Sequence, residues 1–211
     1  RWLATYFTYL QMNGEFLGTL SLVVRNRASI AEFRDMNSAK HLKIIEVNSL
    51  NPNSFEHLNS NRTVVFFAAS STSTARLKKE LVTSPALQLA ETVTGYLPKG
   101  EISFIHLSSG GIYEPGARQL LGVPKDFKTQ LESNNAYIHE KILLENWSTN
   151  QSLKNQFTAL NPRLFSFYGP GLQLDRHFAI GEFLERAQRG LPVEIVGNPR
   201  NRRSYLHPSF F

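Results

Sequence analysis

Residues 102–113 read ISFIHLSSGGIY, and they give the clearest indication of the fold class. Its first six residues predict a buried strand, and the two serines and two glycines that follow predict a turn at the strand's carboxyl end. A hydroxyl at that end of a strand faces the crevice in which open α/β sheets bind ligands. We therefore expect one of the two serine hydroxyls to lie at a ligand site. Alternation along an extended segment turns Ser108 and Ser109 to opposite sides, so only one of them can face it.

Downstream, residues 137–141 read YIHEK, which places Tyr137 and Lys141 four residues apart. On a helix this spacing puts both side chains on one face. A phenol titrates near pH ~10 and is a poor base at neutral pH unless a positive charge stabilises the phenolate, which a Lys one turn away can do. The pair predicts a proton-transfer site, although a Tyr packed beneath a solvated Lys has the same spacing.

Strand and helix patterns alternate along the chain. Strands are predicted at 20–24, 42–47, 63–67, 102–107 and 193–196, with a further apolar stretch at 158–165; helices are predicted at 1–13, 29–37, 75–94 and 179–189, with a helical turn that begins at Pro52. Such alternation predicts a parallel sheet with right-handed crossovers. The 211 residues suffice for one sizeable core, and no linker-like stretch divides them.

The charge pattern favours a small anionic ligand over a nucleic acid. The 23 Lys and Arg against 17 Asp and Glu give a net charge of +6, and the positive residues are scattered except for a cluster at Arg200, Arg202 and Arg203. A nucleic-acid surface would need a dense basic stripe with interleaved aromatic residues. A compact Arg cluster suits a polyphosphate, because Arg binds phosphate bidentately, although a solvated loop is the alternative.

Other features narrow the class of protein. The chain has no Cys, which excludes disulfides, thiolate metal sites and a cysteine nucleophile and is compatible with a reducing cytoplasm. The six His never fall at i, i+4 spacing, so we interpret them as surface or locally bonded residues and predict no metal. The longest apolar runs have the length of strands, so no membrane span is predicted.

Four ordered segments resemble the extended short-chain dehydrogenases/reductases, specifically the NAD-dependent epimerase/dehydratase branch that acts on nucleotide sugars. They are the serine segment, YIHEK at 137–141, RLF at 163–165 with YGPG at 168–171, and the run 177–207. The resemblance implies a Rossmann-like, doubly wound parallel sheet of the α/β class with a small, incompletely represented carboxyl-terminal substrate-binding lobe. It implies an NAD(P)-binding domain at 1–165 and a substrate-binding portion at 166–211.

The resemblance also implies roles for individual residues. Tyr137 would exchange a proton with a sugar hydroxyl or ketone, Ser109 would hydrogen-bond the same oxygen, and Lys141 would stabilise the phenolate and hold the nicotinamide ribose. Cofactor contacts are expected from Arg25, Asn48, Ala68, Ala69, Tyr137, Lys141 and Phe165. Substrate contacts are expected from Ser109, Ser166 and Arg203, the last with the nucleotide diphosphate.

Cofactor choice is expected at the end of the second family strand. There the sequence reads VRNR at 24–27, and a basic residue at this place favours NADP over NAD. The family's glycine-rich motif G-x-x-G-x-x-G is absent, and the chain begins Arg1-Trp2-Leu3, which resembles the residues that follow that motif. We therefore expect the physical protein to be longer, with a preceding strand and glycine-rich turn, a longer carboxyl-terminal lobe and further residues between Ala69 and Leu81.

The reaction implied is hydride transfer at a hexose carbon by an epimerase or 4-ketoreductase. Family 4,6-dehydratases carry Asp-Glu where this chain has Gly110-Gly111, so elimination is disfavoured. The alternatives are an NADP-dependent reductase of a non-nucleotide carbonyl substrate and a non-catalytic nucleotide-binding protein. The segment 174–180 resembles enzymes of deoxyhexose and surface-polysaccharide pathways.

A cytoplasmic homodimer is expected from the resemblance. It would pair through the helix that bears Tyr137 and the predicted helix 75–94. Ile142, Leu143 and Trp147 give the first of these helices more apolar surface than packing on one sheet face requires.

Overall fold

The computed structural model describes residues 2–26, 42–58, 61–68, 84–113, 129, 135–169, 179–195, 198, 200 and 205–207. The chain divides into two compact units. One comprises Arg1–Leu22, Ile30–Lys43 and Phe165–Phe211, and the other comprises Val23–Ser29 and Ile44–Leu164. The expected division into domains at 1–165 and 166–211 remains a prediction.

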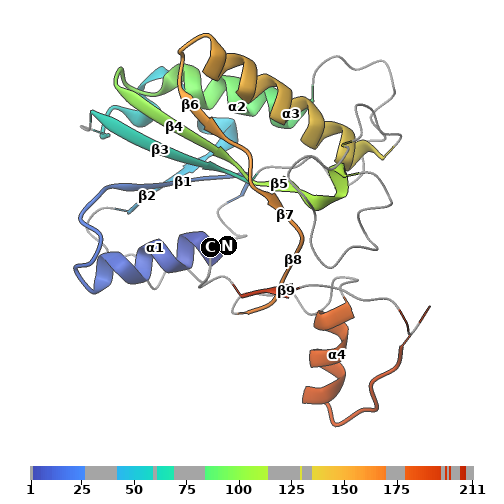
Figure 1. Cartoon of the computed structure of the whole chain (residues 1–211). Helices are drawn as coiled ribbons and strands as arrows, with labels where there is room; N and C mark the ends of the chain where they lie inside the picture. Colours follow the sequence, from blue (N-terminus) through green and yellow to red (C-terminus); the bar gives the residue numbers. More distant parts are fainter. Residues whose placement is uncertain are drawn as a thin grey trace. The chain divides into compact units, whose positions relative to one another are not determined.

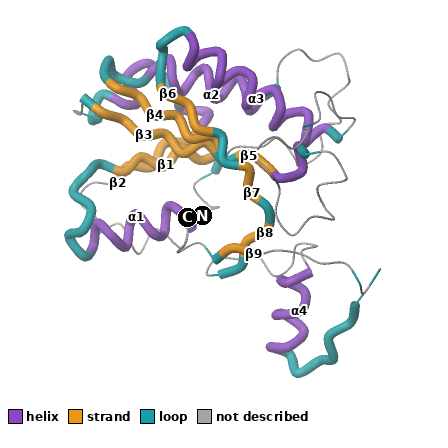
Figure 2. Tube along the Cα trace, viewed as in Figure 1, coloured by secondary structure: helices purple, strands orange, loops and turns teal. Residues whose placement is uncertain are grey.

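The second unit is built on a parallel three-stranded sheet in the order β3-β4-β6 (Figure 1). Its strands are β3 (Arg62–Phe67), β4 (Glu101–His106) and β6 (Thr158–Leu160). Helix α2 (Pro85–Tyr96) connects β3 to β4, and helix α3 (Ala136–Leu153) lies between β4 and β6 in the chain. The predicted alternation of parallel strands with crossover helices is therefore confirmed, and Figure 2 shows it as strands and helices in turn.

Helices α2 and α3 cover one face of this sheet with an aromatic core (Figure 1). Phe104 is fully buried at its centre, and its ring stacks on those of Phe67 and Phe157 at centroid distances of 5.5 and 5.2 Å. Trp147 of α3 meets the same ring edge-on at 5.3 Å. The alternate residues of β3 point to the opposite face, where Val64 and Phe66 are exposed.

A second small core forms around Ile45, Phe55 and Val93. Strands β1 (Leu20–Val24) and β2 (Leu42–Glu46) pair in a two-stranded sheet, followed by the 3₁₀ helices η2 (Val47–Ser49) and η3 (Pro52–Phe55). The predicted turn at Pro52 is confirmed, and Asn51 caps it by accepting the backbone N–H of Asn53 at 2.9 Å. The shorter pairs are β5 (Ser108–Ser109) with β7 (Arg163–Leu164), and β8 (Ser166–Phe167) with β9 (Tyr205–Leu206).

The two remaining helices, α1 (Trp2–Met12) and α4 (Ala179–Gln188), lie where the sequence predicted them. The predicted helix 75–94 is not continuous, because Ser84 is extended, with φ −103° and ψ 152°, and caps α2 by accepting the Leu87 N–H at 3.0 Å. Residues 75–83 lie outside the described residues. The predicted strand 193–196 is also wrong over its described residues, since 191–195 form no strand. The predicted helix 29–37 lies outside the described residues.

Two further observations bear on the predicted partners. Within the part of the chain that the structure describes, no helix is long and apolar enough to cross a bilayer. Ile142 is buried against Ile112 and Ile138, and Trp147 packs on the aromatic core. These two side chains therefore find partners within their own chain, and they are not the surplus apolar surface from which we argued for a dimer.

Candidate active site

Tyr137 stands in the first turn of α3, where a side-chain cap fixes the start of the helix. Asn135 accepts the backbone N–H groups of Tyr137 and Ile138 at 3.0 and 3.3 Å, which satisfies two donors that the helix itself cannot pair. Lys141 follows one turn later, and its Nζ lies 5.7 Å from the centroid of the Tyr137 ring. The predicted helical juxtaposition of the phenol and the amine is therefore present.

The ammonium group of Lys141 is held inside the protein. The residue is 3% exposed, and its Nζ donates a hydrogen bond of 2.8 Å to the backbone oxygen of Leu107 and lies 3.5 Å from Nε2 of His106. Burial lowers the pKa of Lys141 from 10.5 to about 8, against the opposing charges of Glu140 and Glu145. The side chain is thus a buried, localised positive charge rather than a solvated surface Lys.

Ser109 ends β5 and begins the 3₁₀ helix η4 (Gly110–Ile112). Its Oγ accepts the backbone N–H of Gly111 at 3.1 Å, which leaves the hydroxyl proton available for donation. The residue is half-buried, whereas Ser108 is buried and its Oγ has no hydrogen-bond partner among the described residues. Of the two hydroxyls, that of Ser109 is the more accessible to a ligand.

An apolar cluster joins the serine turn to the start of α3. Ile112 of η4 packs with Ile138 and Ile142, and the Tyr137 ring lies against this group. Gly111 lies so close to α3 that a Cβ at this residue would stand 2.5 Å from Cδ1 of Ile138. The segments that carry Ser109, Tyr137 and Lys141 are therefore packed together in one unit.

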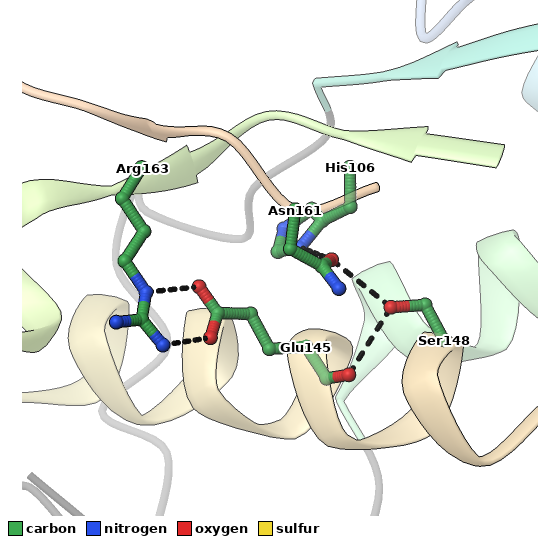
Figure 3. Close-up of polar contacts among 5 residues, drawn as sticks. All are labelled: His106, Glu145, Ser148, Asn161 and Arg163. Atoms are coloured by element: carbon green, nitrogen blue, oxygen red, sulfur yellow. Dashed lines mark hydrogen bonds and ion pairs between the residues drawn. The ribbon is translucent and has the colours of Figure 1, made fainter. Parts of the chain in front are cut away.

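Behind these residues lies a polar network that joins β4, α3 and β7 (Figure 3). Nδ1 of His106 lies 3.1 Å from Oδ1 of Asn161, and the Ser148 hydroxyl lies 3.0 Å from the same oxygen. Arg163 donates two hydrogen bonds to Glu145, from Nε to Oε1 at 2.9 Å and from Nη2 to Oε2 at 2.7 Å. These bonds hold the pKa of Arg163 above its usual range.

Sequence reasoning missed this network. The interpretation of the six His as surface or locally bonded residues is wrong for His106, which is fully buried and bonded to a residue 55 positions away. Two signals were available. His106 alternates with the core residue Phe104 along β4, and Lys141, Glu145 and Ser148 follow one another at helical spacing on α3.

The structure describes some of the expected cofactor and substrate residues and leaves others outside the described residues. Arg25, Asn48 and Ala68 are exposed and follow β1, β2 and β3, respectively. Phe165 and Ser166 lie in the first unit. Ala69 and Arg203, and the segment 174–178, lie outside the described residues. Within the second unit, the structure therefore packs together the segments that carry Ser109, Tyr137 and Lys141.

A sheet of parallel strands with crossover helices, and a Ser, Tyr and Lys packed at the ends of its elements, define a Rossmann-like protein of the extended dehydrogenase/reductase type. The family model described as the NAD dependent epimerase/dehydratase family matches residues 16–209. The chain belongs to this family, and the resemblance found in the sequence is confirmed. Among curated proteins, none matches the chain significantly.

Solved structures of the same fold share little sequence with this chain. The UDP-glucuronic acid 4-epimerase from Bacillus cereus, solved with UDP-glucuronic acid and NAD, is 13% identical with a TM-score of 0.69. The match covers 96% of this chain and 65% of that chain, so this chain spans less than two thirds of the epimerase's length. RMD from Pseudomonas aeruginosa, solved with NADPH, is 19% identical with a TM-score of 0.57, over 90% of this chain and 70% of that one.

Proposed function

We propose that this chain carries the proton-transfer centre of an NAD(P)-dependent nucleotide-sugar epimerase or 4-ketoreductase that acts at a hexose carbon. The observation that carries the proposal is the buried ammonium of Lys141, one helical turn from Tyr137 and 5.7 Å from its ring. A buried unit charge is costly to a fold, so such a group is a candidate for function rather than for stability.

Each of the three side chains has a distinct role in this proposal. Tyr137 exchanges a proton with the hydroxyl or ketone oxygen of the sugar, and the positive charge of Lys141 stabilises the phenolate that results. Ser109 donates its free hydroxyl proton to the same oxygen, since its Oγ already accepts from Gly111. The nicotinamide cofactor, when bound, supplies or accepts the hydride.

The donors present fit the ribose end of such a cofactor. An ammonium group has three N–H bonds, and Leu107 O and His106 Nε2 engage two of those of Lys141. In this proposal the third donates to a ribose hydroxyl. At the adenine end, exposed Arg25 offers a guanidinium suited to the 2′-phosphate of NADP, with Asn48 and Ala68 at the ends of the next strands.

The substrate class rests on the family and on the arginines. UDP-glucuronic acid is the ligand of the epimerase with the same fold. The resemblance of the sequence to the family assigns Arg203 to the diphosphate, and we propose that contact here. Ser166 is proposed as a further substrate contact. Gly110 and Gly111 carry no acid, so the proposed reaction is hydride transfer without elimination.

The test is Tyr137→Phe, which deletes the transferable proton and little else. We expect kcat to fall by about 10²- to 10⁴-fold while NADPH binding is retained. Tyr9→Phe is the matched control, because Tyr9 is exposed on α1 and should leave both unchanged. Unchanged kcat in Tyr137→Phe would rule out the proposed mechanism.

Thermal shifts with UDP-, dTDP-, CDP- and GDP-sugars test the substrate class. If none of these sugars stabilises the cofactor-bound protein, a reductase of a non-nucleotide carbonyl substrate becomes the better supported function.

We also propose, from the family, that the protein is a cytoplasmic homodimer paired through α3 and α2. Two apolar residues of α3 are engaged within the chain, so the dimer contact would have to use the polar face of the helix and Leu143. Light scattering at micromolar concentration decides between dimer and monomer, and cell fractionation tests the location.

A further inference from the structure

We propose that His106 is a positioning residue for Lys141: its neutral imidazole accepts a hydrogen bond from the ammonium through Nε2 and holds it in the orientation that serves Tyr137. The inference rests on the proposed function in assigning Lys141 to catalysis. It adds a residue beyond Ser109, Tyr137 and Lys141, to which the proposed function gives roles.

The hydrogen bonds around His106 fix which nitrogen carries the proton. Nδ1 lies 3.1 Å from Oδ1 of Asn161, and an amide oxygen can only accept, so Nδ1 is the protonated nitrogen. Nε2 then presents its lone pair to Nζ of Lys141, 3.5 Å away. Asn161 is itself held by the Ser148 hydroxyl, which lies 3.0 Å from Oδ1. The tautomer is thus set from the far side of the ring, as is common where a His serves a second group.

The charges around the pair support a neutral imidazole. Burial and the nearby charge of Lys141 lower the pKa of His106 to about 4. Facing the same pair, α3 contributes the carboxylates Glu140 and Glu145, and β7 contributes Arg163, whose charge is matched by Glu145 in a bidentate pair. A protonated His106 would place two positive charges in contact, so the ring serves as an acceptor and not as an acid.

Two acceptors hold the ammonium more firmly than one. Leu107 O accepts one N–H of Lys141 at 2.8 Å, and because Nζ is tetrahedral and bonded to Cε, this contact also sets the directions of the other two. The lone pair of His106 Nε2, 3.5 Å from Nζ, favours the same rotation of the ammonium about Cε–Nζ and leaves the third N–H for Tyr137 and its ligand. A His that only satisfied Asn161 inside the core would not need its second nitrogen to face Lys141.

Two substitutions distinguish the hydrogen bond made by Nδ1 of His106 from the one made by Nε2. In His106→Asn the side-chain amide can still donate to Asn161 but no acceptor reaches Lys141, whereas in His106→Gln the amide oxygen stands near the position of Nε2. The readout is the titration of Lys141 followed by NMR of protein labelled with ¹³C at lysine Cε, with the signal assigned by its absence in Lys141→Met. We expect the Lys141 midpoint to fall by about one pH unit in His106→Asn and to stay within about 0.3 unit of the wild type in His106→Gln. The alkaline limb of the kcat/KM profile should move by the same amount.

Phe104→Leu is the structural control. Phe104 lies two residues before His106 on the same strand and is equally buried, so its truncation should lower thermal stability without moving the Lys141 midpoint. If His106→Asn leaves the midpoint where Phe104→Leu leaves it, His106 is a core residue only and the proposal is wrong. These titrations do not depend on turnover, so they separate failure of this proposal from failure of the proposed function.

A measurement on the wild-type protein tests the proposal even if His106→Asn does not fold. Long-range ¹H–¹⁵N correlation spectra report the tautomer of each neutral histidine. We expect His106 to be neutral at pH 7 with its proton on Nδ1. A proton on Nε2, or a charged ring at that pH, would overturn the proposal.

Discussion

Arg163 and Glu145 are joined by two parallel contacts, from Nε to Oε1 at 2.9 Å and from Nη2 to Oε2 at 2.7 Å. The guanidinium carbon also lies 4.8 Å from the centroid of the Tyr113 ring, directly after η4. Because β7 pairs with β5 in a register that sets Leu164 against Ser109, this contact ties the strand beside the serine to the helix that bears Tyr137 and Lys141. The ion pair therefore stabilises the arrangement of the serine segment and α3.

Arg163→Met should lower the free energy of unfolding by about 2 kcal/mol, because it leaves the carboxylate of Glu145 mostly buried without its partner. Arg189→Met is the matched control, since Arg189 forms an exposed ion pair with Glu185 and its loss should cost less than about 0.5 kcal/mol. Denaturant unfolding measures both. Equal losses of unfolding free energy in the two variants would show that the Arg163 ion pair does not stabilise the site.

Acid should destabilise the fold through His106. Burial lowers its pKa from 6.5 to about 4, so between these values the unfolded chain binds more protons than the folded one. The free energy of unfolding therefore rises with pH across this window, by at most about 3 kcal/mol. Unfolding experiments at pH 4 and 6.5 measure the rise, which His106→Gln should reduce. Identical slopes in the two proteins would contradict the assignment.

Lys141→Met should abolish turnover and yet raise the melting temperature at pH 7. The pKa of Lys141 falls from 10.5 to about 8 on folding, because burial penalises its charge. The wild-type free energy of unfolding thus rises with pH between these values, and below pH 8 the folded state carries the whole penalty, at most about 3 kcal/mol. The loss of the bond to Leu107 O reduces the gain in Lys141→Met. A lower melting temperature at pH 7 would mean that the contacts of the ammonium outweigh its burial.

Arg203→Ala should raise KM for a nucleotide-diphosphate sugar by about tenfold or more, since one charge-assisted phosphate contact is worth roughly 1.5 to 3 kcal/mol. Lys99→Ala removes the same charge from an exposed loop between α2 and β4 and should leave KM unchanged. Steady-state kinetics with the sugar selected by thermal shift give both values. Equal KM values would remove Arg203 from the substrate site.

The sequence predicted which helices and strands exist better than it predicted where they begin and end. Strand β1 was predicted from its apolar residues. Helix α4 was predicted from its apolar periodicity and from the glycine that follows it, and Gly190 has a positive φ of 66°. The start of α2 was missed because apolar and polar residues alternate helically on both sides of Ser84. Only the cap, with Pro85 at the first helical position, marks the boundary.

The spacing of the candidate residues Tyr137 and Lys141 could be predicted from the sequence, but the polar network around them could not. Tyr137 and Lys141 are local, one turn apart on a single helix. His106, Glu145 and Arg163 meet only because β4, α3 and β7 converge, and no periodicity within one segment reports such a meeting. A buried polar residue on a strand can be recognised in the sequence because it interrupts the apolar pattern. Its hydrogen-bond partner cannot be recognised, because the tertiary fold determines which residue lies beside it.

The contact between Gly111 and Ile138 limits the routes by which this chain could acquire a different reaction. A Cβ at position 111 would stand 2.5 Å from Cδ1 of Ile138, the far end of that side chain, so Gly111→Glu would require Ile138 to turn its terminal methyl away. Because Ile138 packs with Ile112 and Ile142, that rotation would loosen the cluster beside Tyr137. An acid at position 111 is therefore coupled to the residue at position 138, and a shorter side chain there would accommodate the acid but would leave a cavity in the cluster.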